Sequence, residues 1–115
     1  MNDLQPGDIV LAVFPFSSLQ AAKARPCLVL AQCAVPEDYL IAYISSSEFA
    51  SKLSTSVKIE PNSDPNSGTG LKLTSYLRVD KLYTLHQSVI AGRIGKLPDR
   101  LMAEVKIALA KLLDL

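Results

Sequence analysis

The chain has 115 residues, of which 49% are hydrophobic and 20% are charged, and its net charge at pH 7 is +1. This length and composition fit one compact domain over residues 1–115 and exclude a disordered or low-complexity protein. The near-neutral charge excludes a surface that neutralises many phosphates at once, so a nucleic-acid role needs a focused site or a dimer that doubles the basic surface.

Most of the chain has the pattern of short strands separated by turns. Clusters of glycine, proline and serine bound runs of aliphatic and β-branched residues, which is typical of strands joined by loops. Pro15–Lys23 is expected to be a mobile loop, and Pro61–Gly70 is expected to lack regular structure. The expected strands are Ile9–Phe14, Arg25–Gln32, Tyr39–Ser45, Val57–Ile59, Leu73–Leu82 and a short segment around Val89-Ile90.

The C-terminal segment predicts an amphipathic helix. Pro98 suits a first helical turn, and Asp99 suits the positive end of the helix. Apolar residues then recur at helical spacing, namely Leu101, Val105, Ala108, Leu109 and Leu112. We expect this stripe to pack on the sheet, which gives a mainly β fold with a C-terminal α-helix, built as a strongly bent sheet or a partly open barrel.

Neither a membrane segment nor a metal site is expected. The apolar runs, such as Ile9–Phe14, have the length of strands and are too short to cross a bilayer, and the first residues lack the features of a secretory signal. Cys27 and Cys33 lie in one strand segment and are expected to be free thiols, while His86 is the sole histidine and leaves zinc too few ligands. We therefore expect a cytoplasmic protein with no membrane partner.

Five short motifs occur along the chain in the order typical of one protein family. They are Gly7-Asp8-Ile9-Val10, Phe14-Pro15-Phe16, Arg25-Pro26 followed by Leu28-Val29-Leu30, Ile44-Ser45-Ser46, and Arg78-Val79-Asp80-Lys81-Leu82. Together with the ending Gly92–Pro98, they resemble the PemK/MazF family, the toxin halves of bacterial toxin–antitoxin pairs. The resemblance runs from about Pro6 to Leu113 and implies an SH3-like barrel with a C-terminal helix, normally a homodimer.

The resemblance also implies a chemistry. Members of this family are mRNA interferases, endoribonucleases that cleave single-stranded RNA at selected sequences without a metal or other cofactor. The ribose 2′-hydroxyl attacks its own phosphate and leaves a 2′,3′-cyclic phosphate and a 5′-hydroxyl. A cognate antitoxin is the implied protein partner, and operator DNA is bound only through the complex with that antitoxin.

Two residues are expected at the phosphate. Arg25 precedes Pro26, which restricts its backbone to an extended conformation, and a planar guanidinium fits a phosphate well. In the family, the arginine of this Arg-Pro motif sits on the scissile phosphate. Ser45 matches a family hydroxyl that helps to hold the phosphate, and Ser46 is its neighbour in the site. An ordinary surface arginine and a strand-ending serine are the alternatives.

A second motif supplies a possible acid–base pair. Arg78 and Asp80 share one face of their strand, so an intrastrand ion pair would account for both charges without any substrate. Some family members use this arginine and aspartate in catalysis, and Asp80 is the one plausible carboxylate base among the matched residues. Thr74 matches a threonine that contacts substrate in some members. Candidate platforms for RNA bases are Phe14, Phe16 and Tyr76, with core packing as the alternative for one of the two phenylalanines.

Two other functions remain open. A related fold also serves toxins that bind gyrase, so the chain could be a non-catalytic toxin acting on a protein. It could also be a degenerate family member kept as a regulatory or DNA-binding partner. His86 matches no family residue of known role and is expected to be structural or exposed to solvent.

Overall fold

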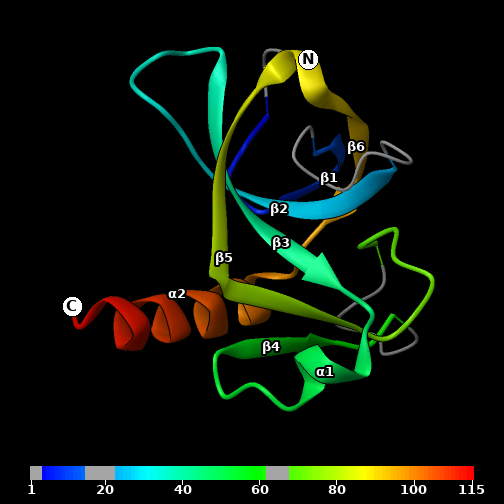
Figure 1. The fold of residues 1–115 in the computed structure, drawn as a ribbon, viewed down its shortest axis with the longest axis vertical. Coiled ribbons are helices and arrows are strands. Elements are labelled where there is room, and N and C mark those ends of the chain that lie inside the picture. Colours follow the sequence, from blue (N-terminus) through cyan, green and yellow to red (C-terminus); the bar gives the residue numbers. More distant parts are fainter. Residues whose placement is uncertain (1–3, 15–22, 62–67) are drawn as a thin grey trace.

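The computed structural model describes residues 4–14, 23–61 and 68–115, which form one antiparallel sheet with a C-terminal helix (Figure 1). The strands are β1 (Asp8–Val13), β2 (Ala24–Gln32), β3 (Asp38–Ser45), β4 (Ser56–Ile59), β5 (Ser75–His86) and β6 (Ile90–Lys96). The helices are the single turn α1 (Glu48–Ser51), the 3-10 turn η2 (Gln87–Val89) and α2 (Asp99–Leu113).

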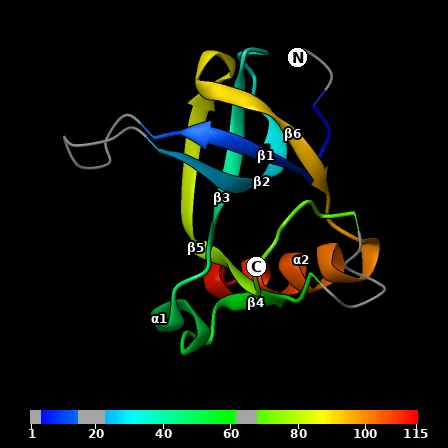
Figure 2. The ribbon, with the colours of Figure 1, turned by 90° about the vertical axis from the view of Figure 1, so that its right-hand side faces the viewer.

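The strands follow the order β4-β5-β3-β2-β1-β6, so β4 and β6 are its two edges and the sheet stays open. The sheet is strongly bent, and β5 runs through both of its halves (Figures 1 and 2). The predicted fold class, a mainly β chain with a C-terminal helix and a partly open barrel, is confirmed.

Several boundaries differ from the prediction. β5 extends beyond Leu82 to His86, and the expected short strand around Val89-Ile90 is a 3-10 turn followed by the longer strand β6. The turn α1 was not predicted. One turn is too short to show a helical period, and it exists because the Ser47 hydroxyl accepts a hydrogen bond from the Ala50 amide at 3.4 Å. Residues 15–22, expected to be a mobile loop, lie outside the described part of the chain.

Alternation along the strands produces two buried clusters on opposite faces of the sheet. On one face, side chains such as Ile44, Leu77 and Val79 pack with Leu101 and Val105 of α2. On the other face, the bent sheet folds over a second cluster that includes Val29 and Tyr39. Beyond that second cluster, near the end of β3, the single turn α1 packs against β4 and β5.

The helix α2 begins as predicted. The Pro98 carbonyl oxygen accepts hydrogen bonds from the Leu101 and Met102 amides, both at 3.0 Å, and Leu101 and Val105 are buried. The predicted apolar stripe does not pack on the sheet over its whole length, because Leu112 at the far end of the helix is 40% exposed. No helix in the described residues is long and apolar enough to span a bilayer.

The two cysteines are free thiols, as predicted. Cys27 is buried in β2, its thiol donates a hydrogen bond to the Arg25 carbonyl oxygen at 3.4 Å, and burial raises its pKa to about 12. A thiol with so high a pKa stays protonated at neutral pH and is a poor nucleophile. Cys27 therefore supports the strand beneath Arg25 and takes no part in covalent chemistry.

Candidate active site

A pocket of about 390 Å³ opens between the start of β2, the end of β3 and the segment that leads into β5. We call it the β2–β3 pocket. It is lined by Arg25, Pro26, Tyr43, Ile44, Ser45, Ser46, Ser47, Leu71, Lys72, Leu73 and Ser75. The predicted residues Arg25, Ser45 and Ser46, which come from two different strands, are thus brought together.

Strand pairing explains why Arg25 meets Ser45. The antiparallel register pairs Cys27 with Tyr43 and Leu28 with Ala42, and its continuation by two residues sets Arg25 opposite Ser45. Directly opposite residues of an antiparallel pair project from the same face. Arg25 is exposed, and no carboxylate among the described residues forms an ion pair with it. Its guanidinium is therefore free to bind an anion.

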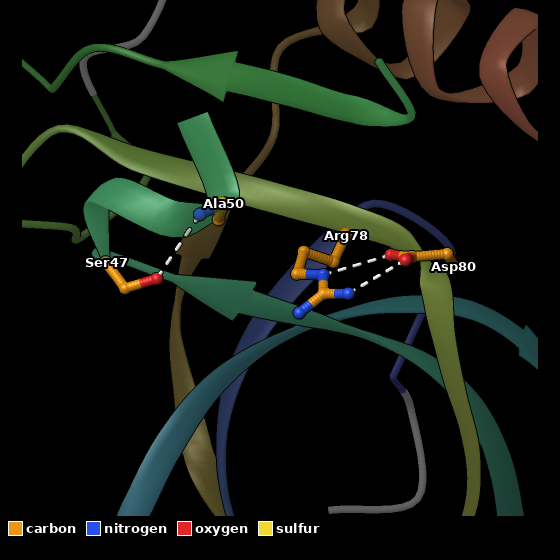
Figure 3. Close-up of polar contacts among 4 residues, drawn as sticks. All are labelled: Ser47, Ala50, Arg78 and Asp80. Atoms are coloured by element: carbon orange, nitrogen blue, oxygen red, sulfur yellow. Dashed lines mark hydrogen bonds and ion pairs between the residues drawn. The ribbon is translucent and has the colours of Figure 1, made fainter. Parts of the chain in front are cut away.

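The Ser45 hydroxyl is oriented by the backbone that follows it. Its oxygen accepts a hydrogen bond from the Ser47 amide at 3.1 Å, and its proton has no acceptor among the described residues. Since one lone pair is already used, the hydroxyl is set to donate. Ser47 in turn caps α1, as Figure 3 shows, so the serine run ends β3 and begins the next turn.

The segment before β5 supplies a second cation that the sequence did not predict. Lys72 lines the pocket between Leu71 and Leu73. The segment is held against β6, because the Lys96 amide donates to the Gly68 carbonyl oxygen at 2.9 Å. Gly70 has φ +78°, and a β-carbon there would clash with the Ile94 carbonyl oxygen. Gly70, which indicated only a loop, allows the close approach that positions Lys72.

The pocket is electropositive. Its two charged lining residues are the cations Arg25 and Lys72, and no carboxylate is among the lining residues that the structure describes. Two cations and a hydroxyl donor around an open hollow fit the non-bridging oxygens of a phosphate diester.

Arg78 and Asp80 form a bidentate ion pair beside the pocket (Figure 3). Arg78 Nε donates to Asp80 Oδ1 at 3.0 Å, and Nη2 donates to Oδ2 at 2.8 Å. The Arg78 hydrogen bonds lower the pKa of Asp80 below its ordinary value, and the same bonds raise the pKa of Arg78. The intrastrand pair foreseen as an alternative is thus present.

A β-bulge sets the position of this pair. The β3–β5 register pairs Ala42 with Leu82 but Tyr43 with Arg78, so β5 carries extra residues between these two points and bends there. Arg78 lies directly opposite Tyr43, which lines the pocket. Arg78 and Asp80 are not among the residues that line the pocket, and Arg78 is next to the lining residue Tyr43 through the strand pairing.

The remaining predicted residues lie around the pocket. Thr74 is exposed between Leu73 and Ser75, both of which line the hollow. Tyr76 is half-buried directly opposite Ser45. Phe16 lies outside the described residues.

His86 is exposed at the far end of β5, where its Nδ1 accepts the Ser88 amide hydrogen at 3.0 Å and caps η2. The expectation that it is structural or exposed is confirmed.

Comparison with known proteins gives one family. The family model of the PemK-like, MazF-like toxin of type II toxin–antitoxin systems matches residues 5–113. No curated protein matches the sequence significantly.

Solved structures share the fold over nearly the whole chain. An endoribonuclease from Mycobacterial species, in complex with its cognate antitoxin, has a TM-score of 0.72 at 22% identity and covers 100% of this chain and 97% of its own. Toxin MazF-mt6 of Mycobacterium tuberculosis has a TM-score of 0.71 at 23% identity, covering 94% and 97%.

The MazE-MazF structure from Deinococcus radiodurans has a TM-score of 0.75 at 19% identity and covers 97% of each chain. At such identities the likeness establishes the fold, and the family rests on the sequence model. Since that model matches all but a few residues at each end, the chain belongs to the PemK-like, MazF-like toxin family of type II toxin–antitoxin systems.

Proposed function

We propose that this protein is an mRNA interferase that cleaves single-stranded RNA without a metal. The observation that carries the proposal is the meeting of Arg25, Ser45 and Lys72 in one electropositive pocket. In the proposed reaction the ribose 2′-oxygen bonds to phosphorus while the bond to the 5′-oxygen breaks. The departing 5′-oxygen takes a proton from solvent, and the products are a 2′,3′-cyclic phosphate and a 5′-hydroxyl. The nucleophile belongs to the substrate, so the protein supplies orientation and charge stabilisation.

Each pocket group has a role in this reaction. Arg25 pairs with a non-bridging phosphate oxygen, and Ser45 donates its free hydroxyl proton to another as negative charge develops. Lys72 adds a second positive charge on the opposite wall. Arginine is a poor proton donor because its pKa exceeds about 12, so Arg25 acts through electrostatics.

The general base is assigned less directly. Asp80 is ionised at neutral pH because Arg78 lowers its pKa, yet both of its oxygens accept hydrogen bonds from that arginine. Asp80 must release one of these bonds before it accepts the 2′-hydroxyl proton. Asp80 is the proposed base, and Arg78 is the group that holds it in place.

The same proposal includes partners. By analogy with the mycobacterial endoribonuclease in complex with its cognate antitoxin and with the MazE-MazF structure, we propose a homodimer neutralised by an antitoxin. An acidic or apolar antitoxin segment across the β2–β3 pocket would block RNA by charge and by bulk. Operator DNA would be bound only through that complex, and a messenger substrate implies action in the cytoplasm.

The non-catalytic alternatives explain less of the structure. A gyrase-binding toxin needs no cation pair around a hydroxyl donor, whereas the pocket holds both. A degenerate regulatory or DNA-binding member would bind nucleic acid at this pocket without cutting it. Cleavage therefore separates both alternatives from the proposal.

The experiment is cleavage of a long unstructured RNA in excess EDTA, with product ends mapped. Wild type is expected to cut at a recurring short sequence and leave cyclic phosphate ends, and Arg25→Ala is expected to lose at least about a hundredfold in rate. Arg100→Ala is the matched control, since Arg100 is 60% exposed on α2 and pairs with Glu104. Absence of cuts by folded wild-type protein, or equal rates for Arg25→Ala, would falsify the proposal.

A further inference from the structure

Single-stranded RNA is commonly held by stacking on aromatic rings. Among the described residues that line the β2–β3 pocket, the one aromatic side chain is Tyr43, which is half-buried. Phe14, beside the Arg25 strand, is only 3% exposed. Its ring packs edge-on against Tyr43 and Tyr83, with centroids 5.5 and 5.2 Å apart. Phe14 is therefore a core residue, and the platform must come from elsewhere among the described residues.

Phe49 has the properties of such a platform. It lies in α1 and is 63% exposed, although an exposed phenylalanine gains little from folding. The turn that carries it is anchored, because Ala50 is fully buried and its amide donates to Ser47 at 3.4 Å. The backbone beneath the ring is thus fixed while the ring projects into solvent.

One side of the ring is already occupied by a cation. The Arg78 guanidinium carbon lies 5.8 Å from the Phe49 ring centroid. The guanidinium is itself held by the two hydrogen bonds to Asp80. Asp80, Arg78 and Phe49 therefore form a chain of contacts from β5 to α1. The bidentate ion pair, drawn in Figure 3, fixes the cation that supports the ring.

The turn that carries Phe49 follows directly from the lining of the phosphate pocket. Ser47 lines the β2–β3 pocket and caps α1, and Phe49 follows two residues later. Arg78 lies opposite Tyr43, which lines the same pocket. A phosphate held by Arg25 would thus leave a neighbouring nucleotide within reach of the ring.

We propose that Phe49 stacks on a base next to the scissile phosphate, and that Arg78 and Asp80 are positioning residues for this platform. This inference rests on the proposed RNA cleavage and adds to it a subsite for a base. RNA is favoured over a protein segment because the ring adjoins two cations and a hydroxyl donor around one hollow. Every base has a π-face, so the contact contributes affinity for the strand without selecting one base.

The test measures binding separately from cleavage. Oligonucleotides with 2′-fluoro riboses lack the nucleophile, and a series carries 2-aminopurine at each position in turn. Wild type is expected to quench one position strongly by stacking. Phe49→Ala is expected to abolish that quenching and weaken binding by about 5- to 150-fold. Phe49→Trp is expected to keep the quenching and the affinity. Phe49→Leu is expected to lose both, because leucine is apolar but has no aromatic ring to stack on a base.

Two further variants complete the set. Val35→Ala is the matched control, since Val35 is 55% exposed in the β2–β3 turn, at the opposite end of the sheet from α1. Arg78→Ala is expected to reduce quenching at the same position and to weaken binding of the uncleavable strand. A merely structural role for Arg78 would not change the fluorescence of a single base.

Failure of this inference is distinguishable from failure of the proposed function. Absence of RNA cleavage by wild type overturns the proposed ribonuclease activity. Stacking is measured separately, by fluorescence quenching in the uncleavable strands. Unchanged binding and quenching in Phe49→Ala overturns the platform even if cleavage is intact, and so does failure of wild type to bind any strand. Loss of antitoxin binding with RNA binding unchanged would make Phe49 a protein-docking residue and would also overturn it.

Discussion

Where the end of β3 pairs with the start of β5, the two faces of the sheet differ in burial and polarity. The face toward α2 carries Ile44, Leu77 and Val79, all buried, whereas the face away from it carries Ser45 and Arg78 at the alternate positions. Strand geometry sends neighbouring side chains to opposite faces, so the same backbone serves both. At this end of the two strands, one face stabilises the fold and the other carries polar groups, so substitutions on the two faces should affect different measurements.

The largest effect is expected on the buried face. Leu77→Ala removes a fully buried side chain from the cluster beneath α2 and should lower the free energy of unfolding by about 2–5 kcal/mol. Urea denaturation measures this change, and the rate per folded molecule should stay near that of wild type. A loss of activity without a loss of stability would show that the two faces are not independent.

The next effect concerns the segment that carries Lys72. Gly70→Ala puts a side chain at φ +78° and against the Ile94 carbonyl oxygen, so we expect about 2 kcal/mol of destabilisation and slower RNA cleavage as the pocket wall shifts. Gly68→Ala is the matched control, because Gly68 also has a positive φ of +97° but its β-carbon would meet no atom within 4 Å. Urea unfolding should rank Gly70→Ala as the more damaging, and the reverse order would contradict the close packing on β6.

On the face of β3 that carries Ser45, a substitution should lower activity and leave stability almost unchanged. Ser45→Ala removes a hydroxyl that no buried group depends on, because its one partner is the amide of exposed Ser47. Stability should change by less than about 0.5 kcal/mol, while kcat/KM for RNA should fall about tenfold with the lost donor. Ser54→Ala, an exposed serine elsewhere, should change neither quantity. Equal rates for Ser45→Ala and wild type would remove Ser45 from the site.

A small effect on stability is expected from the Arg78–Asp80 ion pair, and it depends on pH. The pKa of Asp80 is lowered in the folded protein, so its contribution is present above the ordinary carboxylate value of 3.8 and is lost as pH falls through the lowered one. Both side chains are partly exposed, so Asp80→Asn should cost only about 0.2–1 kcal/mol at pH 7. Denaturation should show a smaller difference in unfolding free energy between wild type and Asp80→Asn at pH 3 than at pH 7. A larger difference at pH 3 would contradict a lowered pKa of Asp80 in the folded protein.

Much of the fold follows from local pattern. The strands β1 to β5 and the helix α2 were predicted because alternation and helical spacing are properties of a few consecutive residues. Arg25 and Ser45 were predicted through motifs, whereas the register that sets them opposite each other includes a shift between Val29 and Ala31. Their roles at a phosphate remain predictions.

Tertiary contacts decided the rest. Phe14 and Phe49 are alike in sequence, yet one is buried against two tyrosines and the other is exposed on a single helical turn. Lys72 reaches the pocket because Gly70 in its own segment and Gly95 in β6 let the two backbones pack closely, although β6 lies much later in the chain. The sequence by itself determined the strands, the helix and the family, since these depend on local pattern and motif order. Which aromatic ring is exposed and which lysine lines the pocket depend on contacts between distant backbones, and no local pattern encodes them.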